Sequence, residues 1–348
     1  MALFLWRSTG SLAQLHLNSA LSVPRWLSSI LKLMLTLGVL GAIVATVDPA
    51  ALLASLRSAE WAWVVVAVLL LPLNLALDGW TWKQLLHTIL DRVPLKPLAG
   101  GVLSGIALGF WTPARVGEYA GRALFLPEGD RWTLSLSVFA QRMVDMAVGV
   151  AVGLALLVGA LAGGAVPATL PWLLTAAVGG GTVAVLLPFM IAPALVHNGT
   201  QRLMPQWAGV TERTAFFQRL TVRQRARVLG GTGARYLVFT GQMVCLGAAF
   251  APSAPVGLLW AAAGLTFYVK YLVPSLTVLD LGIREGGAAV FFQLFGLGAA
   301  AGLNAALLLF TINLLVPALL GAPLVPTLRL SPDVEPVDSR RPAPLSGS

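Results

Sequence analysis

Charged residues within strongly apolar surroundings are the clearest chemical signal in this 348-residue sequence. Downstream of Pro113, the residues Arg115, Glu118 and Arg122 are spaced so that they share one face of a helix. At bilayer depth a carboxylate or guanidinium is costly, and such residues therefore indicate a functional site. Two arginines against one glutamate leave one positive charge uncompensated, which suits an anionic group such as a lipid phosphate.

A structural interpretation stays open beside this one. Glu118 and Arg122 are four residues apart and can simply neutralise each other within a helical hairpin. A secondary polar group, Gln141, Arg142 and Asp145, lies inside a long apolar segment, and its Arg142–Asp145 pair is expected to satisfy itself.

A second polar break covers residues 274–287, where Asp280, Arg284 and Glu285 supply two acids and one base. Gly282 permits unusual backbone angles there. We expect these residues also to contact substrate, and their net charge is opposite to that of the first group. The two groups either pair across a shared cavity or alternate between pairing and binding a ligand. Whether the two breaks meet stays open.

The composition predicts the environment of both breaks. Hydrophobic residues make up 57% of the chain and charged residues 11%, and the mean hydropathy is +0.82. This excess predicts an all-α, polytopic integral membrane bundle of about six to eight spans with two broken or re-entrant segments. Cys245 is the single cysteine and the three histidines have no ligand spacing, so we expect no metal or other cofactor.

Apolar runs give the expected elements. Membrane spans are predicted at Trp26–Val47, Trp61–Asp78, Leu134–Leu161, Leu170–Val196, Leu229–Phe250, Val256–Val273 and Leu303–Leu324. The shorter runs Leu98–Trp111 and Ala288–Ala301 fit half-crossing helices.

Residues that mark the ends and contacts of these elements carry further expectations. Asp78 and Lys270 fall near span ends, where interfacial solvation is expected. Four tryptophans are expected as interfacial anchors, and three regularly spaced glycines as a packing face: Trp61, Trp63, Trp80 and Trp82; Gly101, Gly105 and Gly109.

The charge distribution orients the chain. The formal charge of +9 comes from basic residues between the apolar runs, which favours the positive-inside rule over nucleic-acid binding. The Arg-rich linker 197–227 and the N-terminus are therefore expected in the cytoplasm, and the side of the C-terminus stays open. We divide the chain into an N-terminal cytoplasmic segment (1–25), a transmembrane domain (26–325) and a Pro- and Ser-rich disordered tail (326–348).

The spacing of the breaks indicates an internal repeat. Pro113 and Pro274 are 161 residues apart, close to half the chain. Repeats of this kind place the sites of many transporters at the repeat interface. Four predicted spans lie between the breaks and would give both the same orientation. Inverted symmetry would require one segment to be assigned differently.

The sequences Pro113-Ala-Arg-Val-Gly-Glu-Tyr-Ala-Gly-Arg122 and Gly282-Ile-Arg-Glu-Gly286 resemble the lysylphosphatidylglycerol synthase transmembrane region, also called the flippase-like family. The resemblance implies a helical membrane protein with re-entrant helices, related to the part of the synthase that moves aminoacylated lipid between leaflets. By motif it selects Arg115, Glu118, Arg122, Arg284 and Glu285. In the family a soluble aminoacyl-transfer domain follows the membrane region. Here only a short tail follows, so we do not expect the lipid-modifying activity.

The leading hypothesis is a multi-pass protein of the cytoplasmic membrane that translocates a phospholipid or lipid-linked headgroup, with an anionic phosphate as the expected partner. No nucleotide-binding motif accompanies it. Two alternatives stay open: a membrane transferase acting on lipid-linked substrates, with Glu118 or Asp280 as base, and a non-catalytic partner of an envelope-synthesis enzyme. Self-association is also compatible with the sequence.

Overall fold

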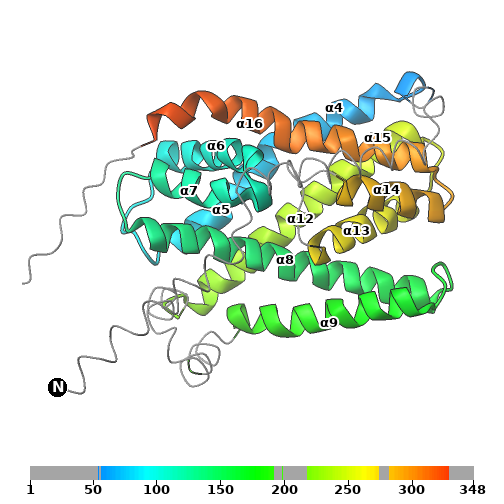
Figure 1. Ribbon diagram of the computed structural model, residues 1–348, viewed down its shortest axis with the longest axis horizontal. Coiled ribbons are helices and arrows are strands. Elements are labelled where there is room, and N and C mark those ends of the chain that lie inside the picture. The colour runs from blue at the N-terminus through cyan, green and yellow to red at the C-terminus, as the bar shows by residue number, and fades with distance from the viewer. Residues whose placement is uncertain (1–53, 55, 192–197, 199–217, 274–281, 329–348) are drawn as a thin grey trace, which may run out of the picture.

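The structure is a computed structural model that describes residues 54, 56–191, 198, 218–273 and 282–328. Every regular element within these residues is a helix, which confirms the predicted helical membrane bundle (Figure 1). Three predictions lie outside the described residues: the span Trp26–Val47, most of the linker 197–227, and the tail beyond residue 328.

Within the described residues, four helical stretches are long and apolar enough to cross a membrane. They are α4 with α5 (Trp61–Leu69 and Leu71–Leu86), α8 (Arg131–Ala162), α9 (Leu170–Ile191), and the stretch of α15 (Ala299–Phe310), η5 (Thr311–Leu315), α16 (Val316–Gly321) and η6 (Ala322–Thr327). A further helix, α12 (Val222–Phe250), has 29 residues and at 1.5 Å per residue is roughly 43 Å long. The protein is therefore a multi-pass membrane protein.

Two shorter helix pairs contain the breaks. In the first, α6 (Leu95–Trp111) is followed by the turn η1 (Pro113–Arg115) and by α7 (Val116–Phe125). In the second, α13 (Val256–Leu272) precedes α14 (Ile283–Leu294), and residues 274–281 between them are not described. Helices α6 and α13 have 17 residues each.

The order of helices is repeated. A long stretch, a 17-residue helix, a break, a short helix and a second long stretch occur once from α4 to α8 and again from α12 to η6. The starts of the two 17-residue helices, Leu95 and Val256, are 161 residues apart, the same separation as between Pro113 and Pro274. The internal repeat suggested by the proline spacing thus extends to whole helices.

One predicted run forms a helix at the expected place but is short, and another was bounded wrongly. The run Val256–Val273 forms α13, which at 17 residues is among the shorter apolar helices and is the first arm of the second pair, equivalent to α6. In the described part of the chain α8, α9 and α12 then lie between the pairs, and three crossings invert the second pair relative to the first. The run Ala288–Ala301 is divided between α14 and α15, because Gly296 and Gly298 with positive φ turn the chain there.

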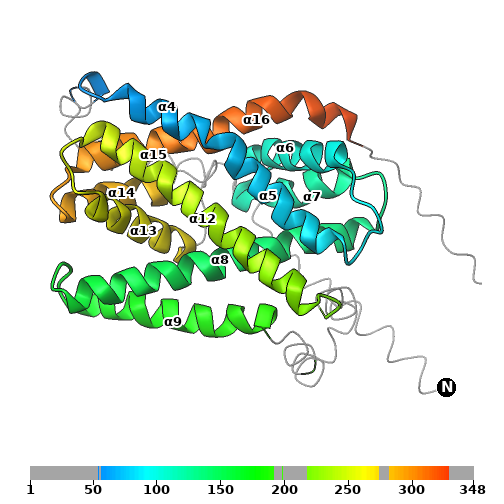
Figure 2. The same cartoon turned by 180° about the vertical axis from the view of Figure 1, so that it is seen from behind.

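Contacts along α12 fix the relative direction of the two halves. The Gln242 side chain donates to the carbonyl oxygen of Ala67 (2.8 Å), and Gly231 lies against Trp80. Helix α12 is therefore antiparallel to α4 and α5. Since α6 follows the end of α5 and α13 follows the end of α12, the two pairs enter the bundle from opposite ends. Figures 1 and 2 show the pairs at opposite ends of the long axis.

The largest core cluster lies where α8, α12, α13, α14 and α15 meet. Tyr268 is fully buried in it, and its hydroxyl donates to the carbonyl oxygen of Thr175 in α9 (2.7 Å). Glycines face this ring: a Cβ on Gly153 would lie 2.4 Å from the Tyr268 side chain and one on Gly179 only 2.0 Å from its hydroxyl. Aromatic packing against small residues holds α8 and α9 to the second half of the bundle.

Candidate functional site

The first break turns sharply on itself. Helix α6 ends at Trp111, and Pro113 cannot continue it because proline has no N–H and clashes with the preceding turn. Ala114 and Arg115 both have left-handed backbone angles, with φ of 52° and 56°. Such angles are costly for residues with a Cβ and often occur at functional sites. At the end of the turn, Thr112 Oγ1 accepts a hydrogen bond from the N–H of Gly117 (2.7 Å).

Glycines bring α6 and α7 into backbone contact. A Cβ on Gly117 would lie 2.5 Å from the carbonyl oxygen of Leu108, and one on Gly121 would lie 2.8 Å from Gly105 Cα. The predicted packing face of α6 is confirmed, because Gly101 lies against Trp82 and the Arg122 backbone while Gly105 and Gly109 lie against Arg122 and Glu118.

Glu118 forms ion pairs with three arginines, and only 3% of the residue is exposed. Arg115 Nη2 lies 3.0 Å from Glu118 Oε2, and Arg122 Nη2 lies 2.7 Å from Oε1. Arg142 of α8 also pairs with Oε1. The predicted row on α7 therefore exists, and it is joined to a neighbouring helix.

Asp78 of α5 is the second carboxylate in the same place. It pairs with Arg122, with Arg142 (3.2 Å) and with Arg235 of α12 (3.3 Å). Gln141 Nε2 donates to the Asp78 carbonyl (2.9 Å) and to Oδ1 (3.1 Å). The expectation of interfacial solvation for Asp78 was wrong, because the residue is only 2% exposed. It lies on the face of α5 that packs into the bundle, and the opposite face of α5 is exposed.

Asp145 of α8 is the third carboxylate. Its Oδ2 pairs with Arg142 Nη1 at 2.6 Å and with Arg235 Nη1 at 2.7 Å. The predicted Arg142–Asp145 pair is confirmed. It is not self-contained, however, because each of its members has a further partner of opposite charge.

Together these residues form what we call the arginine–carboxylate cluster: Arg115, Arg122, Arg142, Arg235, Asp78, Glu118 and Asp145. Four guanidiniums face three carboxylates, so the formal charge of the cluster is +1. The Arg122 side chain is fully buried, while those of Arg115, Arg142 and Arg235 are 32%, 19% and 23% exposed. The most exposed side chains of the cluster are therefore arginines, one each from η1, α8 and α12.

Trp82 lies beneath this cluster. The Arg122 guanidinium lies 5.3 Å from the centre of its ring, and its indole N–H donates to Ser137 Oγ (3.0 Å). The prediction that Trp82 is an interfacial anchor was wrong, since the side chain is fully buried. Trp61, Trp63 and Trp80 are exposed, as anchors would be.

The second break has its own, smaller ion pair. Gly282 has φ of 109° and precedes α14. The Glu285 carboxylate accepts the Gly282 N–H (2.8 Å) and also the Nε–H of Arg284 (3.1 Å). Arg284 is 5% exposed and Glu285 is fully buried. Asp280, the third predicted residue of this break, lies outside the described residues.

The two breaks approach each other through an aromatic ring. Phe310 of α15 lies 6.2 Å from the ring of Phe110 in α6, and the Arg284 guanidinium lies 5.6 Å from the Phe310 centroid. Across the described part of the chain, no ion pair joins Arg284 or Glu285 to the cluster. The expected pairing of the two groups is thus replaced, among these residues, by an aromatic contact.

Sequence reasoning missed two members of the cluster, Asp78 as a buried residue and Arg235 altogether. The signal for Arg235 was available, because a charge within the apolar run Leu229–Phe250 calls for a partner. All three carboxylates already face guanidiniums, and in the described ranges no group of three His, Cys, Asp or Glu side chains can hold a metal ion.

Comparisons with known proteins give one match. A family model described as the lysylphosphatidylglycerol synthase TM region matches residues 29–321. No curated protein and no solved structure matches the chain.

Proposed function

Because the chain belongs to the lysylphosphatidylglycerol synthase transmembrane-region family, we propose that it moves a phosphate-bearing lipid between the leaflets of the cytoplasmic membrane. The observation that carries the proposal is the formal charge of +1 on the arginine–carboxylate cluster, whose most exposed side chains are arginines. A lipid phosphate is the anion that a membrane offers in quantity, and guanidiniums bind it through paired hydrogen bonds.

The proposed binding step follows from the unequal exposure of the arginines. Arg122 is enclosed between Asp78, Glu118 and the Trp82 ring and keeps the carboxylates in place. Arg115 has a single carboxylate partner and the most exposed side chain. It would receive the phosphate first, and Arg142 and Arg235 would follow. In the empty site Glu118 and Asp145 neutralise the same arginines, so binding exchanges one anion for another.

The proposed movement uses the repeat. The cluster joins α5, α7 and α8 of the first half to α12 of the second, so a change in its ion pairs acts on the interface between the halves. Rocking of one repeat against the other is a common route to alternating access in proteins built in this way. Arg284 and Glu285 belong to the proposal as groups that a headgroup contacts after their mutual pair opens.

The test is lipid movement in proteoliposomes containing fluorescent phosphatidylglycerol, followed by quenching of the outer leaflet. Arg115→Gln is expected to slow movement about tenfold, since a hydrogen bond to a charged group contributes roughly 1.5–3 kcal/mol. Arg92→Gln, an exposed change in the loop before α6, is the matched control and is expected to leave the rate unchanged.

Two outcomes would contradict the proposal. One is wild-type protein that moves lipid no faster than empty liposomes do. The other is Arg115→Gln together with Arg142→Gln retaining the full rate, which would make the cluster a structural junction alone.

A further inference from the structure

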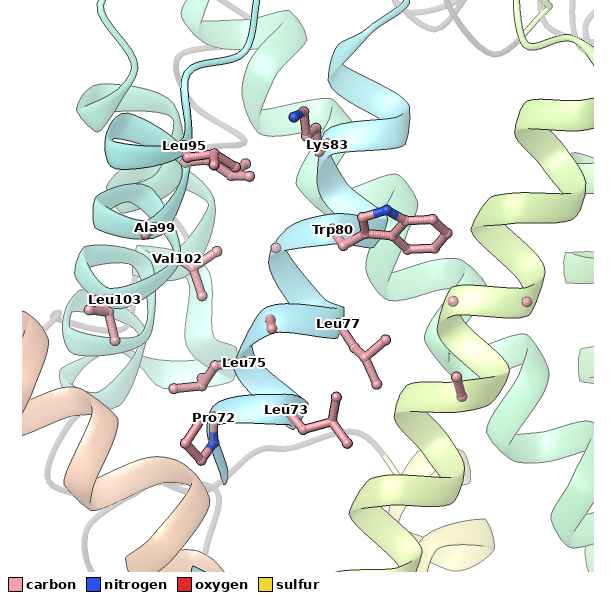
Figure 3. A pocket seen from close by; sticks show the side chains of 16 residues that line it. Pro72, Leu73, Leu75, Leu77, Trp80, Lys83, Leu95, Ala99, Val102 and Leu103 are labelled. Atoms are coloured by element: carbon pink, nitrogen blue, oxygen red, sulfur yellow. The ribbon is translucent and has the colours of Figure 1, made fainter. Parts of the chain in front are cut away.

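A large groove lies on the other face of α5, away from the cluster. Helices α5, α6 and α12 enclose a volume of about 900 Å³, at the upper end of the range of small-molecule sites. Figure 3 shows Leu73, Leu77 and Val102 among its walls. Of all the lining residues only Lys83 is charged.

Small residues make the room. A Cβ on Gly230 of α12 would meet nothing within 4 Å, and Ala99 of α6 adds only a methyl group. Gly79 and Gly231 instead allow close contacts, since Cβ atoms there would lie 3.6 Å from Val102 and 2.5 Å from Trp80. Leu73 and Trp80 line the groove and are 47% and 40% exposed, so the groove opens at the outer surface of the bundle. In a membrane that surface faces lipid.

The length of the groove matches one leaflet. Pro72 and Lys83 lie at its two ends in Figure 3. Eleven residues of helix between them span roughly 17 Å, against about 15 Å for half of a hydrocarbon core. Pro72 lies near the middle of the continuous apolar stretch Trp61–Leu86 and Lys83 near its end. The groove therefore runs from the bilayer centre to one headgroup layer.

The Lys83 end is basic on all three helices. Gly231 lies against Trp80 and Gln242 binds Ala67, and this antiparallel register places Arg227 level with Lys83. On α6, Lys96 lies at the first turn, on the same side of the bundle as the end of α5. Basic residues at a span end are expected on the cytoplasmic side.

We propose that this groove binds one anionic diacyl phospholipid of the cytoplasmic leaflet, with its acyl chains along α5 and its phosphate at Lys83. An apolar helix would pack against the walls of the groove but would bring no anion to Lys83. An anionic lipid provides acyl chains for the apolar walls and a phosphate for Lys83. Binding here does not depend on transport, because the groove and Asp78 lie on opposite faces of α5.

The test is photo-crosslinking in phosphatidylcholine nanodiscs that contain phosphatidylglycerol with a diazirine on one acyl chain. Labelled peptides are expected from residues 72–83, 95–103 and 230–234. Lys83→Gln is expected to reduce this labelling about five-fold, and Ala99→Phe, which occupies the groove, to abolish it. Arg57→Gln and Ala184→Phe, exposed changes of the same kinds elsewhere, are expected to leave it unchanged.

The inference is overturned if diazirine-labelled phosphatidylcholine labels the groove equally well, or if Lys83→Gln and Ala99→Phe both keep wild-type labelling. It is also overturned if a photoreactive amino acid placed at Leu77 crosslinks only to residues 26–47 of the same chain, since that segment would then be the occupant. Failure of lipid movement in Arg115→Gln with unchanged groove labelling would separate this site from the proposed transport site.

Discussion

The two breaks share a local design and differ in what their glutamates bind. In both, the residue before the second helix has positive φ: Arg115 before α7 and Gly282 before α14. In both, a glutamate occupies the third position of that helix, Glu118 and Glu285. A glutamate at this position normally reaches back to cap the helix N-terminus.

Glu285 does reach back, and Glu118 does not. The Glu285 carboxylate binds the Gly282 N–H and neutralises its neighbour Arg284, so the second break closes within one helix end. At the start of α7 the Gly117 N–H donates to Thr112 Oγ1 instead, and Glu118 pairs with three arginines. Freed from capping, Glu118 links α7 to α8.

This difference in the partners of the two glutamates bears on which break can bind an anion from outside the protein. Among the described residues, Arg284 and Glu285 have only each other as ion-pair partners, whereas each carboxylate in the cluster has two or more guanidiniums within 4 Å of it. A network can lose one contact and keep the others. If an anion binds at the first break, as we propose, the carboxylates it displaces keep other guanidinium partners, whereas the described residues of the second break give Arg284 and Glu285 only each other as ion-pair partners.

The largest expected effect is on stability at the second break. Glu285→Gln leaves Arg284 without the carboxylate that it pairs with at 5% exposure, and we expect a loss of about 3–5 kcal/mol in the free energy of unfolding. Glu118→Gln is expected to cost less, about 1–2 kcal/mol, because Arg122 and Arg142 retain Asp78. Denaturant unfolding in detergent micelles, followed by tryptophan fluorescence, measures both.

A double variant serves as control for this contrast. Arg284→Met combined with Glu285→Gln removes the stranded charge and is expected to recover part of the loss. Equal losses for Glu118→Gln and Glu285→Gln would show that the cluster has no redundancy, and the contrast between network and pair would fail.

Backbone substitutions in the two breaks are expected to change the free energy of unfolding by intermediate amounts and in opposite directions. Gly282→Ala introduces a Cβ at φ of 109°, and we expect a loss of about 1–2 kcal/mol. Ala114→Gly relieves a left-handed angle of 52° and is expected to raise the free energy of unfolding by about 0.5–1 kcal/mol. The same unfolding assay applies. Destabilisation by Ala114→Gly would show that the turn is not strained in the folded protein.

Local features of both breaks could be predicted from the sequence, because they depend on residue type. Pro113 disfavours continuation of the preceding helix, and Gly282 marks a position that permits unusual backbone angles. The i, i+4 spacing places Glu118 and Arg122 on one face without any knowledge of the fold. The proline separation likewise indicated the repeat.

The membership of the cluster could not be predicted, because it depends on how helices rotate and align. Asp78 lies among apolar residues on α5, and only the packed bundle decides whether it faces inward or outward. Trp80 and Trp82 lie in the same stretch of sequence and looked equivalent there, yet Trp82 is buried and Trp80 is exposed. Asp78 and Arg235 are 157 positions apart in the sequence, and only the packing of α5 against α12 brings them together.

The smallest expected effect is at the aromatic contact between the breaks. The Arg284 guanidinium lies over Phe310, and Phe310→Leu keeps an apolar side chain there but removes the aromatic face. We expect a loss of about 0.5–1 kcal/mol, in the range of a cation–π contact. Phe139→Leu, at a 47% exposed ring, is the control and is expected to cost less. Because Arg284 has one carboxylate partner among the described residues and Arg122 has two, the ring contributes a larger share of these contacts at the second break. An unchanged free energy of unfolding in Phe310→Leu would show that the pair with Glu285 alone holds Arg284, and that the two breaks are joined by nothing more than apolar packing.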